Sequence, residues 1–425
     1  MKDIYTALQS GYSEPIRDVL WGHIYLTSGL TALIKSEPFM RLSRIFQLGP
    51  AYVVYPGATH TRAAHSIGVY HLARRLLLNL VERGAGTWLS PAGVVSFLCA
   101  ALLHDLGHFP YTHSLKELPL IRHEVLTAEI ILREPIKSLV AGAGGDPALT
   151  AAIVDTGLPG GNEKEPVFYQ KLLSGALDPD KLDYLNRDAR YCGVPYGAQD
   201  VDFILSHLYP DSERGVVIDG RGIPSVESIL FSKYLMYRAV YWHPTVRSAT
   251  AMVKKALIGG LEDGVITPED LYGLDDAGLF GLLSDSSHPL FHLAEKVHAG
   301  RFYTVIAEFP FEETLHRSLL DISKRSRHEA ALAAELSLPG KTLGPESIII
   351  DIPEPISFET GLVVADEGCY FSESSSVFNP KVVDSLIKSL RIIRIFVDPD
   401  HENRVKLHPK FEEILHIHKK WLNLT

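Results

Sequence analysis

Apolar residues in the first half of the chain recur with the spacing of helices. Between residues 64 and 84, five positions share one helical face: His65, Val69, Leu72, Leu76 and Leu80. Gly84 is suited to end this helix. The pattern therefore predicts a buried helical face with His65 at its N-terminal end.

A second helix is predicted to begin near Ser90 and Pro91. Its inward face carries Val94, Phe97, Ala101 and His104. Gly107 and Pro110 mark its end. The dipeptide His104-Asp105 thus follows an unbroken apolar run, where polar side chains normally need partners.

A third helix is predicted within DPDKLDYLNRDARY, residues 178–191. Asp180, Tyr184, Arg187 and Tyr191 share one face, and Lys181, Tyr184 and Asp188 share its neighbour. Such a helix could present a carboxylate to a metal and Lys181 to a phosphate. For Asp183 and Arg187, an ordinary ion pair at positions i and i+4 is the alternative.

The middle of the chain contains turn signals and a further helical stretch. Glycine-rich loops are predicted at 142–145 and 157–161, the second continuing to Pro166. VVIDGRGIP, residues 216–224, predicts a hairpin that turns at Asp219-Gly220. Residues 225–260 then return to helix.

The hydrophobic pattern changes near Arg301 from helical spacing to short β-branched runs. Short β-branched runs occur at 301–310, 347–353, 361–366 and 392–399, with helices expected at 312–324 and 380–390. We therefore predict a mostly α protein, with a helical domain over residues 1–300 and a smaller α+β domain over 301–425.

Composition excludes several classes of partner. The net charge of −10 disfavours a general nucleic-acid surface. The longest apolar run, residues 94–103, is shorter than the ~20 residues that cross a bilayer, so no membrane partner is expected. Three widely spaced cysteines and a start without signal-peptide character favour a cytoplasmic protein.

Four polar residues stand in these apolar helical stretches and predict a metal site: His65, His104, Asp105 and Asp180. Buried imidazole and carboxylate groups are costly without partners, and one metal ion could satisfy all four. This N/O donor set suits Mn, Mg, Fe, Co, Ni or Zn. Such an ion can lower the pKa of water to ~7 and polarise a phosphoryl oxygen, so hydrolysis of a phosphate ester or anhydride is the natural use. For His104-Asp105 alone, a hydrogen-bonded structural pair is the alternative.

Proton-transfer and cationic groups surround the same segments. Candidate catalytic residues are His108, His113, His123 and Glu124. The basic residues Arg62, Lys181, Lys233 and Arg238 have the chemistry that a polyphosphate requires, although for any one of them alone a solvated surface charge is the favoured interpretation.

Six ordered segments carry a family resemblance. They read IRDVLWGHIYL, MRLSRIFQLGPAYVVYPGATHTRAAHSIGVYHLA, LLHDLGHFPYTH, HE at 123–124, DKLDYLNRDARYCGV and KYLMYRAVYWH. Over residues 12–260 the chain resembles the HD-domain phosphohydrolase superfamily, and within it the dNTP triphosphohydrolase branch.

The resemblance implies a reaction and a role for each site residue. His65, His104, Asp105 and Asp180 would hold the metal, and a metal-activated water would attack the α-phosphorus of a dNTP to release a deoxynucleoside and triphosphate. Arg62, Lys181 and Lys233 would bind phosphates, while His108, His113, His123 and Glu124 would surround the reacting phosphorus, with His113 as general acid. The sugar would be surrounded by Gln47, Leu48, Tyr184, Asp188 and Tyr241, of which Leu48 and Tyr241 could exclude a ribose 2′-hydroxyl.

Departures from the family pattern concern regulation. Met40 and Ser43 replace the Gln and Arg that read an activating guanine nucleotide in the animal members, and Pro244 replaces an activator-contacting Lys. Lys233 stands where those members have Arg. The resemblance therefore favours a constitutive homo-oligomer, a dimer or tetramer, over nucleotide-triggered assembly.

Two alternative functions stay open at the level of sequence. One is an HD phosphohydrolase for nucleoside di- or monophosphates or cyclic nucleotides. The other is a low-turnover nucleotide-binding regulator that contacts a partner through residues 301–425. Base preference, effector and native metal are not specified by these patterns.

Overall fold

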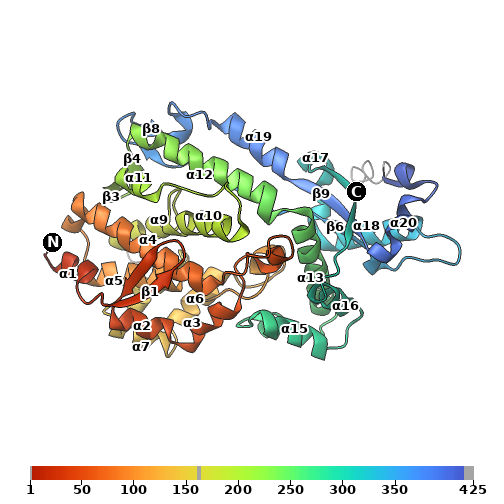
Figure 1. Cartoon of the computed structure of the whole chain (residues 1–425), viewed down its shortest axis with the longest axis horizontal. Coiled ribbons are helices and arrows are strands. Elements are labelled where there is room, and N and C mark those ends of the chain that lie inside the picture. Colours follow the sequence, from red (N-terminus) through yellow and green to blue (C-terminus); the bar gives the residue numbers. More distant parts are fainter. Residues whose placement is uncertain (1, 160–163, 416–425) are drawn as a thin grey trace.

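The computed structural model describes residues 2–159 and 164–415, and its larger part is a layered assembly of helices (Figure 1). The helices of this part are α1 (Lys2–Gln9), α2 (Ser28–Ile34), α3 (Glu37–Arg41), α4 (Arg62–Glu82), α5 (Pro91–Leu103), α6 (His123–Ile131), α7 (Ile136–Gly142), α8 (Pro147–Val154), α9 (Lys164–Leu173), α10 (Pro179–Cys192), α11 (Val201–Ser206), α12 (Ile223–Met236) and α13 (Pro244–Glu262). The hairpin β1 (Glu14–Asp18) and β2 (Gly22–Leu26) lies beside them.

The remaining elements follow α13. They are α14 (Pro268–Leu271), α15 (Asp276–Asp285), α16 (His292–His298), β5 (Thr304–Pro310), α17 (Glu313–His316), α18 (Ile322–Glu335), β6 (Ile348–Asp351), β7 (Val363–Val364), β8 (Cys369–Tyr370), α19 (Pro380–Leu390), β9 (Ile392–Val397) and α20 (Pro399–Lys406). The mostly α fold with small sheets agrees with the sequence prediction.

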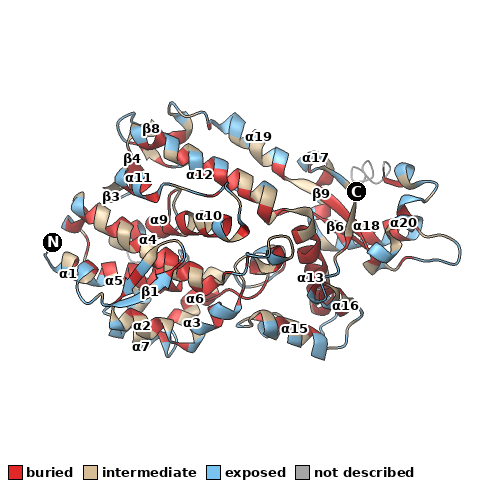
Figure 2. Ribbon diagram, viewed as in Figure 1, coloured by how far each residue is buried: buried red, intermediate tan, exposed pale blue. Residues whose placement is uncertain are grey.

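The central helix α4 packs against both α5 and α10. The predicted inward face of α4 is buried, from His65 through Leu80, and Gly84 adopts the left-handed conformation beyond the helix end. Ser90 caps α5 as predicted, because its side chain accepts a hydrogen bond from the amide of Gly93. The buried positions of α4 and α5 appear as red stretches in Figure 2.

Three local predictions are wrong. The hairpin strands are β3 (Leu208–Asp211) and β4 (Gly215–Ile218), so the turn precedes β4, whereas Asp219 caps the next turn by accepting from the amide of Gly222. The helix expected at 312–324 is split, because Asp321 caps a separate helix α18. Residues 164–166 begin α9 rather than extending a loop, and loop positions 160 and 161 lie outside the described residues.

The late part of the chain divides between two sheets. β5, β9 and β6 form an antiparallel sheet. The short strand β7 instead pairs in parallel with β4, and β8 pairs with β7. Phe358, Leu362 and Phe371 accordingly belong to the same apolar core as α4 and α5. The predicted division at residue 300 stays a prediction.

Helix α12 leads into one turn of π-helix at Tyr237–Tyr241, after which Pro244 starts α13.

Cys99, Cys192 and Cys369 are unpaired thiols. Among the helices of the described residues, none is both long enough and apolar enough to cross a bilayer.

Candidate metal and active site

Three helices bring the predicted metal ligands together. His65 lies in the first turns of α4, His104 caps the C-terminus of α5, and Asp180 lies in the first turn of α10. His65 Nε2 is 3.0 Å from Asp180 Oδ1, and His104 Nε2 is 3.9 Å from the same oxygen. Asp105 Oδ1 lies 3.3 Å from His104 Nε2. His65, His104 and Asp180 thus form one group of potential ligand atoms, and Asp105 contacts this group through His104.

The orientation of His104 fits a metal ligand. Its Nδ1 faces the carbonyl oxygen of Ala101 at 3.0 Å, which makes Nδ1 the protonated nitrogen and leaves a lone pair on Nε2. Within the described residues, this buried Nε2 has no hydrogen-bond partner. A buried lone pair that faces two carboxylates is a position for a divalent cation.

His65 is oriented from behind by a carboxylate. Its Nδ1 lies 2.9 Å from Asp183 Oδ2, so that Nε2 points toward Asp180. Burial disfavours the charged imidazole, but hydrogen bonds and charge from Asp180 and Asp183 outweigh burial and raise the pKa of His65 to about 10. A carboxylate behind a ligating histidine fixes its tautomer and raises its basicity.

Asp183 belongs to a buried polar network that sequence reasoning treated only as one possible ion pair. Arg187 binds both oxygens of Asp183, at 2.8 and 2.9 Å, and also reaches Asp18 at 2.9 Å. Trp21 Nε1 donates to Asp183 Oδ1 at 2.7 Å. A Cβ on Gly68 would collide with Asp183, so glycine permits the close approach of α4 to α10. The Asp183–Arg187 pair is therefore confirmed, with an added role in holding His65.

Asp105 connects the metal cluster to cationic and imidazole groups. Arg62 Nη1 donates to Asp105 Oδ2 at 2.8 Å, and His108 Nε2 lies 3.2 Å from Asp105 Oδ1. Burial opposes the charge of Asp105, yet His108, His104 and Arg62 hold its pKa well below the usual range. Asp105 is therefore an anion over the whole physiological pH range.

The predicted catalytic histidines form a second cluster. The ring centroid of His108 lies 4.0 Å from that of His123 and 4.7 Å from that of His113. Glu124 Oε2 is 3.4 Å from His123 Nδ1. Burial and the charge of Arg62 lower the pKa of His108 and His113, so both rings are neutral near pH 7. Asp105, His108 and His123 also form a group of potential ligand atoms.

A buried arginine holds the loop that carries this cluster. Arg41 Nη1 donates to the carbonyl oxygens of His108, at 2.6 Å, and Leu274, at 2.9 Å, while Nη2 donates to that of Leu106. Tyr111 adopts a left-handed conformation at φ 63° just before His113. The sequence assigned no function to Arg41, because its partners are distant in the chain.

The two predicted phosphate-binding lysines are already paired with carboxylates. Lys181 Nζ donates to Asp178 Oδ2 at 2.7 Å, and Lys233 Nζ donates to Glu359 Oε2 at 2.9 Å. The charge of Glu359 also helps to raise the pKa of Lys181. Both lysines therefore belong to one electrostatic neighbourhood, in which Glu359 was not predicted.

Two of the five predicted sugar-contacting residues, Asp188 and Tyr241, are joined by a hydrogen bond. Tyr241 donates to Asp188 Oδ2 at 2.6 Å from the π-helical turn, and His60 Nε2 lies 2.8 Å from Asp188 Oδ1. The buried side-chain oxygen of Gln47 has no partner among the described residues. Leu48 and Tyr184 are partly buried against the main core. His60 was missed, although it precedes α4 in the quoted family segment.

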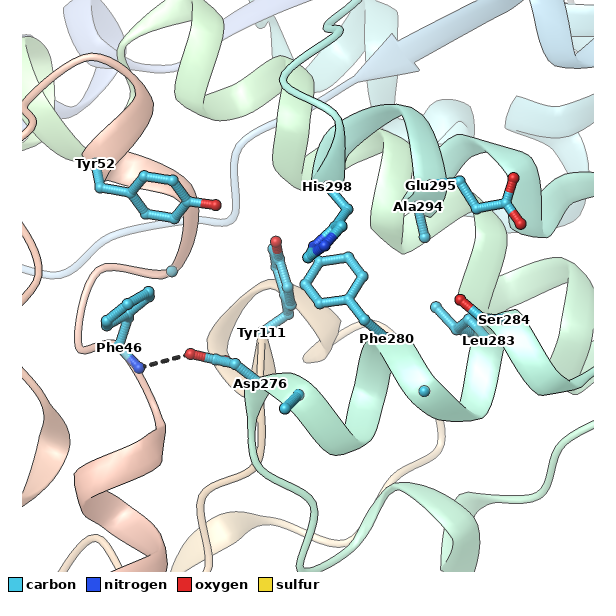
Figure 3. A pocket seen from close by; sticks show the side chains of 13 residues that line it. Phe46, Tyr52, Tyr111, Asp276, Phe280, Leu283, Ser284, Ala294, Glu295 and His298 are labelled. Atoms are coloured by element: carbon cyan, nitrogen blue, oxygen red, sulfur yellow. Dashed lines mark hydrogen bonds between the residues drawn. The ribbon is translucent and has the colours of Figure 1, made fainter.

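A hollow of about 520 Å³ is lined by none of the proposed metal ligands, and Figure 3 shows the residues that line it. Phe46 and Tyr52 form one side, while Tyr111, Phe280 and His298 face them. Asp276 at its edge accepts a hydrogen bond from the Phe46 amide at 2.8 Å. The neighbouring residues Gln47 and His113 connect this hollow to the proposed site along the chain.

Comparison with known families identifies the class. Residues 62–152 match the HD domain, and residues 200–423 match the HD-associated region. The chain belongs to the family of HD-domain proteins that carry this HD-associated region.

Individual relatives share parts of the chain. YwfO of Bacillus subtilis is 39% identical over 227 residues, which cover 53% of this chain and 50% of that protein. The deoxynucleoside triphosphate triphosphohydrolase SAMHD1 of Gallus gallus is 24% identical over 339 residues, covering 72% of this chain and 52% of that protein. The chain spans between 50% and 60% of the length of these and another curated relative.

A solved structure extends the likeness to almost the whole chain. The crystal structure of a phosphohydrolase from Bacteroides thetaiotaomicron superposes with a TM-score of 0.68 at 26% identity. It covers 90% of this chain and 99% of that one. The arrangement of both parts of the chain is thus shared with this protein.

Proposed function

We propose that this chain is a metal-dependent phosphohydrolase that converts dNTPs to deoxynucleoside and triphosphate. One observation carries the proposal: the unpaired lone pair of His104 faces Asp105 and Asp180 beside a set of buried cations. The likeness to a triphosphohydrolase and a phosphohydrolase supports it.

His65, His104, Asp105 and Asp180 would hold one divalent ion. When bound, such an ion supplies Lewis-acid polarisation of a phosphoryl oxygen and lowers the pKa of a coordinated water. Mn, Mg, Fe, Co, Ni and Zn are all compatible with two imidazoles and two carboxylates. Asp183 keeps His65 in the tautomer that such binding needs.

Cationic residues bind the phosphate chain in this proposal. Arg62 is buried beside Asp105 and can place its guanidinium against a phosphoryl group. Lys181 and Lys233 supply two further point charges. Their combined charge holds the scissile bond between the metal ligands and the histidine cluster.

The histidine cluster provides proton transfer during the proposed hydrolysis. His113, the proposed general acid, is neutral near pH 7 because burial and Arg62 lower its pKa. The negative charge of a bound phosphate chain opposes both effects, so His113 gains a proton as substrate binds and returns it to the leaving 5′-oxygen. His108, His123 and Glu124 would surround the reacting phosphorus, where the neutral His108 can accept the proton that the attacking water loses.

The sugar end is selected by shape. Tyr241 is fixed by its bond to Asp188, which His60 also contacts. Together with Leu48, this fixed ring would exclude a ribose 2′-hydroxyl by bulk, and Gln47 and Tyr184 would border the sugar. A deoxyribose is therefore preferred over a ribose.

The test is an activity grid of metals against nucleotides with anion-exchange detection of products. The proposal predicts inorganic triphosphate and deoxynucleoside in equal amounts from at least one dNTP, and no product from Asp105→Ala. Release of orthophosphate or pyrophosphate would instead assign the site to another nucleotide substrate. Nucleotide-dependent thermal stabilisation without turnover would favour a regulator.

We further propose a cytoplasmic homo-oligomer, a dimer or tetramer, with a helical domain over residues 1–300 and a second domain after it. The replacement of activator-reading residues by Met40, Ser43 and Pro244 supports assembly without a nucleotide. Light scattering of the purified full chain, with and without nucleotide, tests this: a nucleotide-dependent change in mass would contradict it.

A further inference from the structure

One side of the proposed site carries Lys181 and Lys233 and is here called the lysine side. A segment late in the chain contacts Lys233 on this side. Residues 352–362, here called the strap, have no helix or strand and join β6 to β7. Phe358 and Leu362 are buried in the main apolar core, and β7 pairs with β4. The strap is thus fixed at both sides of Glu359.

Glu359 points from the strap to Lys233. Its Oε2 lies 2.9 Å from Lys233 Nζ, and its Oε1 accepts a hydrogen bond from Ser357 Oγ at 2.9 Å. The carbonyl oxygen of Ser357 accepts a second bond from Lys233 Nζ at 2.7 Å. Two of the three donors of the buried Lys233 ammonium are therefore used by the strap.

The charge of Glu359 reaches beyond this one pair. It acts on Lys181 and on the phenols of Tyr184 and Tyr237. Lys181 and Tyr184 also face the charge of Asp178, and Tyr237 faces that of Lys181. A carboxylate among these groups has the charge and the oxygen acceptors of a phosphate. The Glu359 side chain is one-third exposed, so it can leave Lys233 without breaking the core contacts of Phe358.

Resting on the proposed function, we infer that Glu359 is an internal competitor for the phosphate chain, and that substrate binds by displacing its carboxylate from Lys233. Before binding, Glu359 and the carbonyl oxygen of Ser357 hold the Lys233 ammonium. On binding, Lys233 exchanges the carboxylate of Glu359 for a phosphate. Glu359 thereby weakens binding of every phosphate chain and limits product retention, while the metal ligands and the histidines are untouched.

Calorimetric titration of the full chain with inorganic tripolyphosphate tests this without turnover. Glu359→Gln keeps the size and one acceptor oxygen but removes the charge that holds Lys233, so we expect roughly three- to tenfold tighter binding. Asp384→Asn removes one exposed charge from α19 and is the matched control, with no change expected.

A double-mutant cycle separates competition from a structural effect. In a Lys233→Met background, Glu359→Gln should no longer improve tripolyphosphate binding, because the two residues act through one contact. With an active substrate, Glu359→Gln should lower KM by the same factor and leave kcat within about twofold. Unchanged or weaker tripolyphosphate binding by Glu359→Gln, or an equal gain without Lys233, would overturn the inference. If no nucleotide is hydrolysed, the proposed function fails, while the tripolyphosphate titration still decides the role of Glu359.

Discussion

The metal cluster and the lysine side of the site are built in opposite ways. The metal ligands come from α4, the end of α5 and α10, and their supporting carboxylate Asp183 lies one turn along α10. The lysine side is completed by Glu359, which follows Lys233 by 126 residues. The first region is thus a rigid unit of the HD helices, whereas the second depends on a strap from the late part of the chain.

This difference fits two roles, which are retention of a metal ion and exchange of a phosphate ligand. Ligands carried on packed helices, with the histidine rings oriented by hydrogen bonds from behind, suit an ion that stays in place. A cation whose partner is partly exposed suits a ligand that must enter and leave. Substitutions in the two regions should therefore have different kinetic signatures, and the following outcomes test that expectation in decreasing order of effect.

The largest effect is expected from Asp105→Asn. The substitution keeps the shape but removes the charge that faces His104, His108 and Arg62. We expect hydrolysis to fall by roughly a thousandfold or more, because both metal binding and the orientation of Arg62 are lost. Product release per hour measures this, and thermal melting confirms that the variant is folded. Retention of a tenth of the activity would contradict a role in the metal centre.

A smaller loss of metal binding is expected from Asp183→Asn, because Asp183 contacts the proposed ligand His65 on its Nδ1 side. The neutral side chain no longer balances the charge of Arg187, and its single acceptor oxygen cannot keep all the bonds that Asp183 accepts from His65, Arg187 and Trp21. Metal affinity should fall by roughly 10- to 100-fold, and the free energy of unfolding by about 3 kcal/mol, since a buried pair loses one charge. Metal titration and chemical denaturation measure the two effects separately. Loss of stability with unchanged metal affinity would limit Asp183 to a structural role.

On the lysine side, Lys233→Met should act mainly on KM. Loss of one charge from the phosphate-binding set should raise KM by roughly tenfold and change kcat less. Lys381→Met, at an exposed position on α19, is the control and should change neither constant. A fall in kcat with constant KM would show that Lys233 acts on the reaction step. The two regions would then not differ in their kinetic signatures.

The smallest effect concerns a carboxylate outside both regions. Burial raises the pKa of Asp276 to about 6, so the folded state binds its proton more tightly than the unfolded state. This contribution favours folding at low pH and is lost as the pH rises from about 4 to 6. The melting temperature of Asp276→Asn relative to the natural chain should therefore increase between pH 4 and pH 7. A constant difference would mean that Asp276 does not titrate in this range.

The parts that sequence predicts well are those governed by local periodicity. The faces of α4 and α5, the cap at Ser90 and the inward direction of His65 all follow from residues within one or two helical turns. The ion pair of Asp183 and Arg187 also follows from local spacing. Its burial does not, because burial depends on Trp21 and Asp18 from the distant β1–β2 hairpin.

The parts that sequence missed depend on distant partners. Asp219-Gly220 has the composition of a hairpin turn, but Asp219 instead accepts the Gly222 amide as a cap. The pairing of β7 with β4 brings the strap onto the helical part. Neither periodicity nor motif spacing indicates that Glu359 meets Lys233, since only the folded chain joins them.

The most direct test of the metal centre is calorimetric titration of the full chain with Mn²⁺, which requires no substrate. His104→Ala removes the imidazole whose buried Nε2 has no partner within the described residues, and His298→Ala, at the separate hollow, is the control. We expect Mn²⁺ affinity to fall by roughly 100-fold or more in His104→Ala and to stay unchanged in His298→Ala. Equal Mn²⁺ affinity in His104→Ala and the natural chain would contradict the assignment of His65, His104, Asp105 and Asp180 as the metal site.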